Sequence, residues 1–194
     1  MLVESHPFEP FLPGNARLLM LGTFPPAEKR WCMKFYYPNF TNDMWRIFGL
    51  CFFGNKMHFV LQDERSYDLE RIIPFLQKKG IALYDTATRI VRTTGTASDK
   101  DLQIVEETNL SALLIQLPHC RAVVTAGQLA TAIACKQFSI REPKVGEYQE
   151  FSLSESSSSP HLYRLYRMPS SSRAYPMTVE RKAAYYQQVF DYIK

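Results

Sequence analysis

Four short segments typical of strands, separated by segments of helical periodicity, constrain the fold of this chain most. Residues 16–21, 81–84 and 122–126 are almost entirely apolar, and residues 162–168 form the fourth, which includes Arg164 and Arg167. A nearly continuous apolar run of this length is typical of a strand in a parallel sheet that is covered on both faces. Strands that alternate with helices predict an α/β fold, here a three-layer α/β/α sandwich with a mostly parallel central sheet.

Amphipathic stripes predict the helices between these runs. Apolar residues recur at helical spacing over residues 42–53, 69–76, 110–117, 129–138 and 179–193. Thr41 or Asn42 is a candidate N-cap of the first helix, and Thr178 of the last. Because Pro74 interrupts the second stripe, we expect that helix to start later than its stripe does.

Length and composition fit an ordinary globular protein. We expect residues 1–194 to form a single domain. The 46% hydrophobic and 22% charged residues exclude a largely disordered chain. Lys and Arg number 23 against 19 Asp and Glu, a net charge of +4 that permits a nucleic-acid partner without requiring one. No apolar run approaches the roughly 18 residues that a membrane span needs, and the first residues do not look like a secretory signal.

Neither the cysteines nor the histidines have the spacing of a metal site. No C-x-x-C pair occurs among Cys32, Cys51, Cys120 and Cys135. We therefore expect reduced, buried thiols in a cytoplasmic protein, without a metal. Of the histidines, only His161 beside the last strand is kept as a remote candidate for a pocket.

Polar and aromatic segments follow the predicted strands. In parallel sheets, ligands bind beyond the carboxyl ends of the strands. Residues 22–26, 85–92 and 169–175 leave those ends, and residues 35–45 lie between the first strand and its helix. We expect these four segments to converge on one cleft.

The segment FYYPNFTNDMW at residues 35–45 combines aromatic rings with two side-chain amides. A ring can stack on a planar base, and an amide can recognise its edge or hold a water molecule. The alternatives are structural: at least two of the rings can belong to the core, and Asn42 can cap a helix.

Several sequence motifs occur in a fixed order along nearly the whole chain: GTFP at 22–25, YYPNFTNDMW at 36–45, GIALYD at 80–85, VVTAGQLA at 123–130, and MPSSSRA at 168–174, followed by Lys182. Together they resemble the uracil-DNA glycosylase superfamily, nearest to its hypoxanthine-DNA glycosylase and mismatch-specific uracil-DNA glycosylase branches. The resemblance implies a uracil-DNA glycosylase-like fold. It also implies a monofunctional DNA glycosylase for base excision repair, a monomer that needs no cofactor and acts on DNA with a damaged or mismatched base.

The resemblance also implies roles for individual residues. Asn42 would be catalytic by placing a water molecule, with Asn39 as the second candidate. The base pocket would consist of Gly22, Thr23, Phe24, Pro25, Tyr36, Tyr37 and Asp85, of which Tyr37 would stack on the base. DNA phosphates would be held by Ser170, Ser171, Ser172, Arg173 and Lys182. For Asp85, a structural role in binding loop N–H groups remains an equal alternative.

The chain departs from the pattern of the superfamily at several positions. Asn39 replaces a histidine, Phe40 and Arg173 replace prolines, and Phe24 stands where some branches carry a catalytic Asn or Asp. These departures favour, as the alternative function, a catalytically silent module of the same fold that binds DNA lesions. A weaker third hypothesis is an enzyme that acts on free nucleosides or modified RNA.

Overall fold

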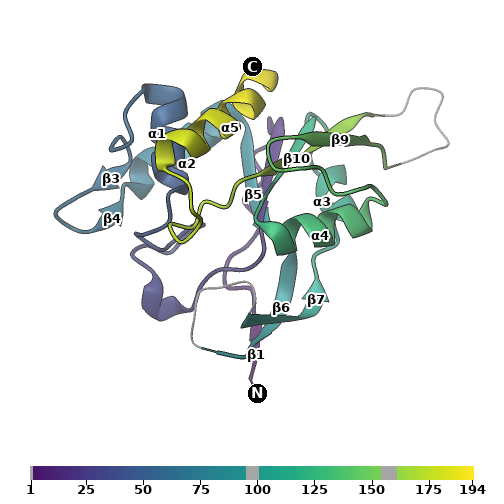
Figure 1. Cartoon of the computed structure of the whole chain (residues 1–194), viewed down its shortest axis with the longest axis horizontal. Coiled ribbons are helices and arrows are strands. Elements are labelled where there is room, and N and C mark those ends of the chain that lie inside the picture. The colour runs from purple at the N-terminus through teal and green to yellow at the C-terminus, as the bar shows by residue number, and fades with distance from the viewer. Residues whose placement is uncertain (1, 95–100, 154–160) are drawn as a thin grey trace.

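The computed structural model describes residues 2–94, 101–153 and 161–194, and its centre is a five-stranded sheet (Figure 1). The strand order is β5-β2-β8-β10-β9. The strands β2 (Leu18–Gly22), β5 (Ile81–Asp85), β8 (Ala122–Ala126) and β10 (Tyr163–Met168) run parallel, and β9 (Tyr148–Phe151) is antiparallel to β10 at one edge. The prediction of a mostly parallel central sheet is confirmed.

Helices cover both faces of this sheet (Figure 1). The helices α1 (Met44–Phe53), α2 (Leu69–Lys79) and α5 (Val179–Tyr192) lie on one face, and α3 (Leu110–Ile115) and α4 (Gln128–Gln137) on the other. This division follows from the strand order: the chain moves outward from β2 to β5, then back through β8 to β10, and right-handed crossovers in opposite directions place their helices on opposite faces. None of the described helices is long and apolar enough to cross a membrane.

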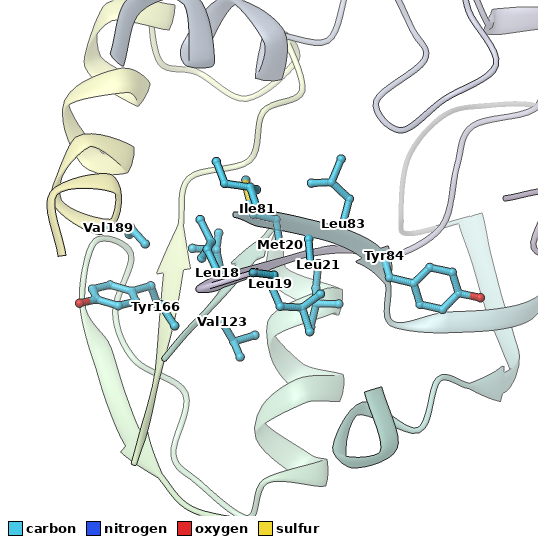
Figure 2. Packing of buried hydrophobic residues seen from close by; sticks show 14 of the residues in the cluster. Leu18, Leu19, Met20, Leu21, Ile81, Leu83, Tyr84, Val123, Tyr166 and Val189 are labelled. Carbon is cyan, nitrogen blue, oxygen red and sulfur yellow. The ribbon is translucent and has the colours of Figure 1, made fainter. Parts of the chain in front are cut away.

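The core is centred on β2. Figure 2 shows Leu18, Leu19, Met20 and Leu21 surrounded by apolar side chains of the neighbouring elements. These four side chains are fully buried, and full burial of each contributes about 1.5–3 kcal/mol. Because both faces of β2 are covered by helices, the strand has no polar alternation, which is why its position could be predicted.

Two smaller sheets were not predicted. The strands β1 (Val3–Ser5), β6 (Ala87–Arg92) and β7 (Leu102–Glu107) form an antiparallel sheet in the order β1-β6-β7, and β3 (Val60–Leu61) pairs with β4 (Ser66–Tyr67). The segment 85–92, expected to be a cleft segment, is therefore mostly a strand. Polar residues interrupt its buried ones, Ala87, Ile90 and Val91, so it lacks the continuous apolar run of the central strands.

The register of the central strands aligns their carboxyl ends. Gly22 of β2 pairs with Asp85 of β5, and Met168 of β10 pairs with Ala126 of β8. The loops after all four parallel strands therefore leave the same edge of the sheet, which is where a ligand site is expected in such folds.

The N-terminal segment runs beside β5, the outer parallel strand. The backbone N–H of Phe11 donates to Leu83 at 3.0 Å, and the N–H of Leu83 donates back at 2.9 Å. This isolated bridge satisfies part of a strand edge that would otherwise be unpaired.

Helix boundaries lie within three residues of the sequence patterns, and the expected starts of two helices were wrong. The second helix begins at Leu69 and includes Pro74, so the expected later start was wrong; the Asp68 side chain accepts from the Arg71 N–H at its N-terminus, and Ile72 and Leu76 are buried. The first helix begins at Met44 rather than at residue 42. Thr178 caps α5 as predicted, its side chain accepting from the Arg181 N–H.

Candidate functional site

A cavity of about 1140 Å³ opens at the carboxyl edge of the parallel strands. Its walls come from the loop after β2, from residues 36–42, from the start of α4 and from residues 168–176 after β10, with Asp85 of β5 between them. The structure thus brings together segments that lie up to 150 residues apart in the sequence.

The loop Gly22–Pro26 forms one wall and is held by backbone contacts. The Thr86 N–H donates to the Gly22 carbonyl at 2.9 Å, and the Arg92 guanidinium donates to the Pro25 carbonyl at 2.5 Å. Arg92 also lies over the Phe24 ring at 5.6 Å. Thr23, Phe24 and Pro25 all line the cavity, with Phe24 the most accessible of the three.

The two tyrosines of the aromatic segment have different environments. Tyr36 is only 3% exposed, and its hydroxyl donates to the Glu9 carbonyl at 2.7 Å, so most of its ring belongs to the core. Tyr37 is half-buried at the cavity wall and packs edge-on against Trp45. Burial raises the pKa of both phenols, which keeps the hydroxyls neutral.

The backbone at Tyr37 has φ 51, in the left-handed region. For a residue with a large side chain this conformation costs roughly 1–2 kcal/mol. This backbone conformation lies at the point where the chain passes from Tyr36 in the core to Tyr37 at the cavity.

Asn42 both supports its helix and lines the cavity. Its Oδ1 accepts from the Met44 N–H at 2.9 Å, a contact that satisfies one donor at the start of α1. The Nδ2 donor has no partner among the described residues. The N-cap of α1 is Asp43, whose side chain makes no capping hydrogen bond, so the predicted N-cap at Thr41 or Asn42 was wrong. Asn42 precedes the N-cap, contacts the first N–H of the helix and lines the cavity.

Asn39 also lines the cavity, but its side chain closes a local turn. Its Oδ1 accepts from the Thr41 N–H at 3.0 Å and from the Thr41 hydroxyl at 2.9 Å. This leaves less of its polar surface available to a ligand than in Asn42.

A buried cluster fixes the backbone carbonyl of Asn42. The Arg46 guanidinium donates to the carbonyls of Phe40 at 2.9 Å and Asn42 at 3.2 Å, and the Tyr67 hydroxyl donates to the Asn42 carbonyl at 2.7 Å. Arg46 also contacts the Tyr67 hydroxyl and lies over the Phe40 ring. Side chains of α1 and β4 thus hold the backbone of Asn42 in place.

The serine loop after β10 is joined directly to the Asn42 segment. Asn42 and Ser172 form a β-bridge, and the Asp43 N–H donates to the Ser171 carbonyl at 2.8 Å. Ser170 and Ser172 accept backbone N–H groups of their own loop, from Ser172 at 3.2 Å and from Ala174 at 3.3 Å. Ser171 is buried, whereas Ser172 and the neighbouring arginine are exposed.

Lys182 does not lie where a DNA contact requires it. Its side chain is 0% exposed and does not line the cavity; Nζ donates to Asp43 Oδ2 at 2.9 Å and to the Ser172 carbonyl at 2.7 Å. The expectation of a direct phosphate contact is therefore replaced by a structural role, in which Lys182 ties the serine loop to α1. Arg173, 53% exposed, lies 3.4 Å from the other Asp43 oxygen.

Positive charge dominates the cavity walls. Among the described residues, the charged side chains that line it are Arg30, Arg92, Arg167, Arg173 and Asp85. Three of the four guanidinium groups also lie within 3.7 Å of a carboxylate outside the lining, Arg92 of Glu4, Arg167 of Glu142 and Arg173 of Asp43. The groups that face the cavity itself are nevertheless mostly cationic, which favours an anionic ligand. Within the described ranges, no group of three or more His, Cys, Asp or Glu side chains could hold a metal ion.

Asp85 lies at the floor of this cavity and is held by a residue that the sequence analysis did not select. Asp85 Oδ2 is 2.9 Å from Nε2 of His6, whose side chain is 3% exposed. Arg92 and Asp43 were missed as well, because each acts on the site through a contact that sequence spacing does not encode. His161 is not among the cavity residues; its Nε2 lies 2.6 Å from the Cys120 carbonyl.

No protein-family model and no curated protein matches this chain. Its structure is similar to a solution NMR structure from Methanosarcina acetivorans, whose protein is named "putative Uracil DNA glycosylase". The similarity covers 99% of both chains with a TM-score of 0.68 and 21% sequence identity. It shows that the two proteins share a fold.

Proposed function

We propose that this protein is a monofunctional DNA glycosylase that removes a deaminated or mismatched base, uracil or hypoxanthine, from DNA. In this proposal it acts as a cytoplasmic monomer without a cofactor. The observation that carries the proposal is the position of Asn42, whose amide lines a cationic cavity between the aromatic segment and the serine loop. The shared fold with a protein named as a uracil DNA glycosylase supports it.

The reaction needs few protein groups. Hydrolysis of the N-glycosidic bond leaves positive charge on the sugar and negative charge on the departing base. The enzyme must extrude the nucleotide, hold the base and direct a water molecule to C1′. The proposed role of Asn42 is to orient this water, and Tyr37 would stack on the extruded base beside the wall formed by Thr23, Phe24 and Pro25.

The DNA backbone would be held at the rim of the cavity. Ser172 and Arg173 are exposed on the loop after β10, beside Asn42. Hydroxyls, backbone N–H groups and a guanidinium are the usual donors to phosphate oxygens. Arginine side chains on the opposite wall extend the positive surface along which a strand could lie.

The test is a panel of single- and double-stranded oligonucleotides that contain uracil, hypoxanthine or xanthine. Abasic products are cleaved with alkali and separated by size. Strand cleavage at one of these bases is the expected result. Folded protein that cleaves none of them would contradict the proposal, and tight binding to the lesion without cleavage would instead identify a silent lesion-binding module.

A further inference from the structure

The side chain of Asp85 is the single carboxylate among the described residues that line a cavity otherwise rich in arginine. A buried carboxylate is costly unless it is hydrogen-bonded. Its position is therefore informative, because a carboxyl group lies where a polyanion is proposed to bind.

One oxygen of Asp85 is fixed by His6. Nε2 of His6 lies 2.9 Å from Asp85 Oδ2, and since an ionised carboxylate only accepts hydrogen bonds, Nε2 carries the hydrogen. Nδ1 lies 2.8 Å from the Phe8 carbonyl oxygen and 3.1 Å from the Phe8 N–H, so the Phe8 backbone holds the other side of the ring. The His6 backbone N–H donates to the Thr88 carbonyl at 2.8 Å, so the ring is anchored beside β6.

The other oxygen, Oδ1, lies over Gly22. A Cβ atom at Gly22 would come within 2.5 Å of it, so the carboxylate can hold this orientation only next to a glycine. Oδ1 has no hydrogen-bond partner among the described residues, and the side chain is 9% exposed at the cavity. Oδ1 of Asp85 is therefore an oriented hydrogen-bond acceptor that a donor on a ligand could use.

We infer that Asp85, positioned by His6 and Gly22, accepts a hydrogen bond from a ring N–H of the extruded base. This inference rests on the proposed function and defines its substrate class. Deamination converts N3 of cytosine and N1 of adenine from acceptors into the N–H donors of uracil and hypoxanthine. A fixed carboxylate oxygen aligned with the ring nitrogen accepts from the N–H of the deaminated base and repels the ring lone pair of the parent base, whose remaining donor is the adjacent exocyclic amino group. A site built for one hydrogen bond can reject an analogue that lacks the donor by about 10⁴-fold.

The test compares bases that differ at this nitrogen alone. Single-turnover rates are measured on oligonucleotides with uracil against N3-methyluracil, and hypoxanthine against N1-methylhypoxanthine. The wild-type protein should prefer the N–H member of a pair by about 10²-fold or more. In Asp85→Ala that preference should narrow to less than about 10-fold, because the N–H substrate slows while the methylated one does not.

Further variants separate positioning from folding. His6→Ala and Gly22→Ala should narrow the preference as Asp85→Ala does, and His6→Gln, which keeps a donor for Asp85, should restore part of it. His161→Ala is the matched control, because it removes a histidine hydrogen bond outside the cavity and should leave the preference unchanged. If the Asp85 and His6 variants slow both members of a pair equally, the inference is wrong.

A binding measurement keeps this result distinct from failure of the proposed function. Fluorescence anisotropy with oligonucleotides whose 2′-fluoro sugar resists cleavage measures the same preference without catalysis. A protein that cleaves nothing but binds the N–H base more tightly through Asp85 would refute the glycosylase and support the inference. Equal affinity for both members of each pair would overturn the inference whether or not the protein is an enzyme.

Discussion

Lys182 of α5 and Asp43 at the start of α1 form an ion pair inside the protein, with Nζ 2.9 Å from Oδ2 and exposed side-chain fractions of 0% and 7%. The same ammonium donates to the Ser172 carbonyl. One buried charge pair therefore joins two helices to the loop that closes the cavity.

Removal of one partner should be strongly destabilising. Lys182→Met leaves the Asp43 carboxylate buried without its main partner, and we expect the free energy of unfolding to fall by about 3–5 kcal/mol. Urea unfolding followed by circular dichroism measures the change. The control is Lys56→Met, which removes an exposed pair with Glu180 at 2.9 Å and should cost less than about 1 kcal/mol. Equal losses in the two variants would contradict a special role of the buried pair.

Asn42 can be tested without loss of its hydrogen bond to the start of α1. Asn42→Ser keeps an oxygen for the Met44 N–H but removes the amide, so we expect base release to slow by about 10²-fold while stability changes little. Single-turnover kinetics and thermal unfolding give the two values. Asn109→Ala is the counterpart: it removes the cap of α3 from Ala112, away from the cavity, and should lower stability by about 1 kcal/mol with activity intact. Unchanged turnover in Asn42→Ser would exclude Asn42 from catalysis.

Arg173 should contribute to DNA affinity through phosphate contacts. Arg173→Ala is expected to weaken binding of any sequence and to reduce the slope of log affinity against log salt by about 1. Fluorescence anisotropy at several salt concentrations measures both. Arg121 is exposed immediately before β8, at the opposite end of the strand from the cavity, and Arg121→Ala should leave the slope as it is. The same slope in all three proteins would argue against a phosphate contact at Arg173.

Stability should decrease in alkaline solution because of buried thiols. Burial raises the pKa of Cys120 from 9.0 to about 12, so the folded protein retains a proton that the unfolded chain loses. This contribution is complete below about pH 9 and is lost as the pH rises towards 12. Between pH 8 and pH 10.5, urea unfolding should show the wild type losing on the order of 1–2 kcal/mol more than Cys120→Ala. Equal losses of unfolding free energy in the wild type and in Cys120→Ala would mean that the thiol ionises as easily in the folded state as in the unfolded chain.

The central sheet could be predicted from the sequence because its signals are local. Strands β2, β5 and β8 are short apolar runs, and residues 18–21 need no knowledge of distant residues to be identified as buried. The edge strand β9, which is mostly exposed, was not predicted. The convergence of loops at one edge follows from the parallel arrangement alone. Strand β6 was missed because polar residues interrupt its apolar ones, as in many exposed segments, and only pairing with β1 and β7 makes it a strand.

The contacts that orient the site could not be predicted in the same way. His6 meets Asp85 across 79 positions of sequence, Arg92 meets Pro25 across 67, and Lys182 meets Asp43 across 139. No periodicity links such pairs, since they depend on how the sheets pack together. For Lys182 the motif order predicted a basic residue near the cavity but not the direction of its side chain, which points inward.

The segment before β2 makes two separate contacts. Phe11 pairs with Leu83 at the edge of the outer strand β5, and His6 contacts Asp85 at the floor of the cavity. Proteolysis in this segment would therefore expose unpaired backbone groups of β5 and remove the hydrogen bond that holds the Asp85 carboxylate. Protein truncated in this segment should both aggregate more readily and lose its preference for bases with a ring N–H. The intact mass of each preparation should therefore be checked before its kinetics are interpreted.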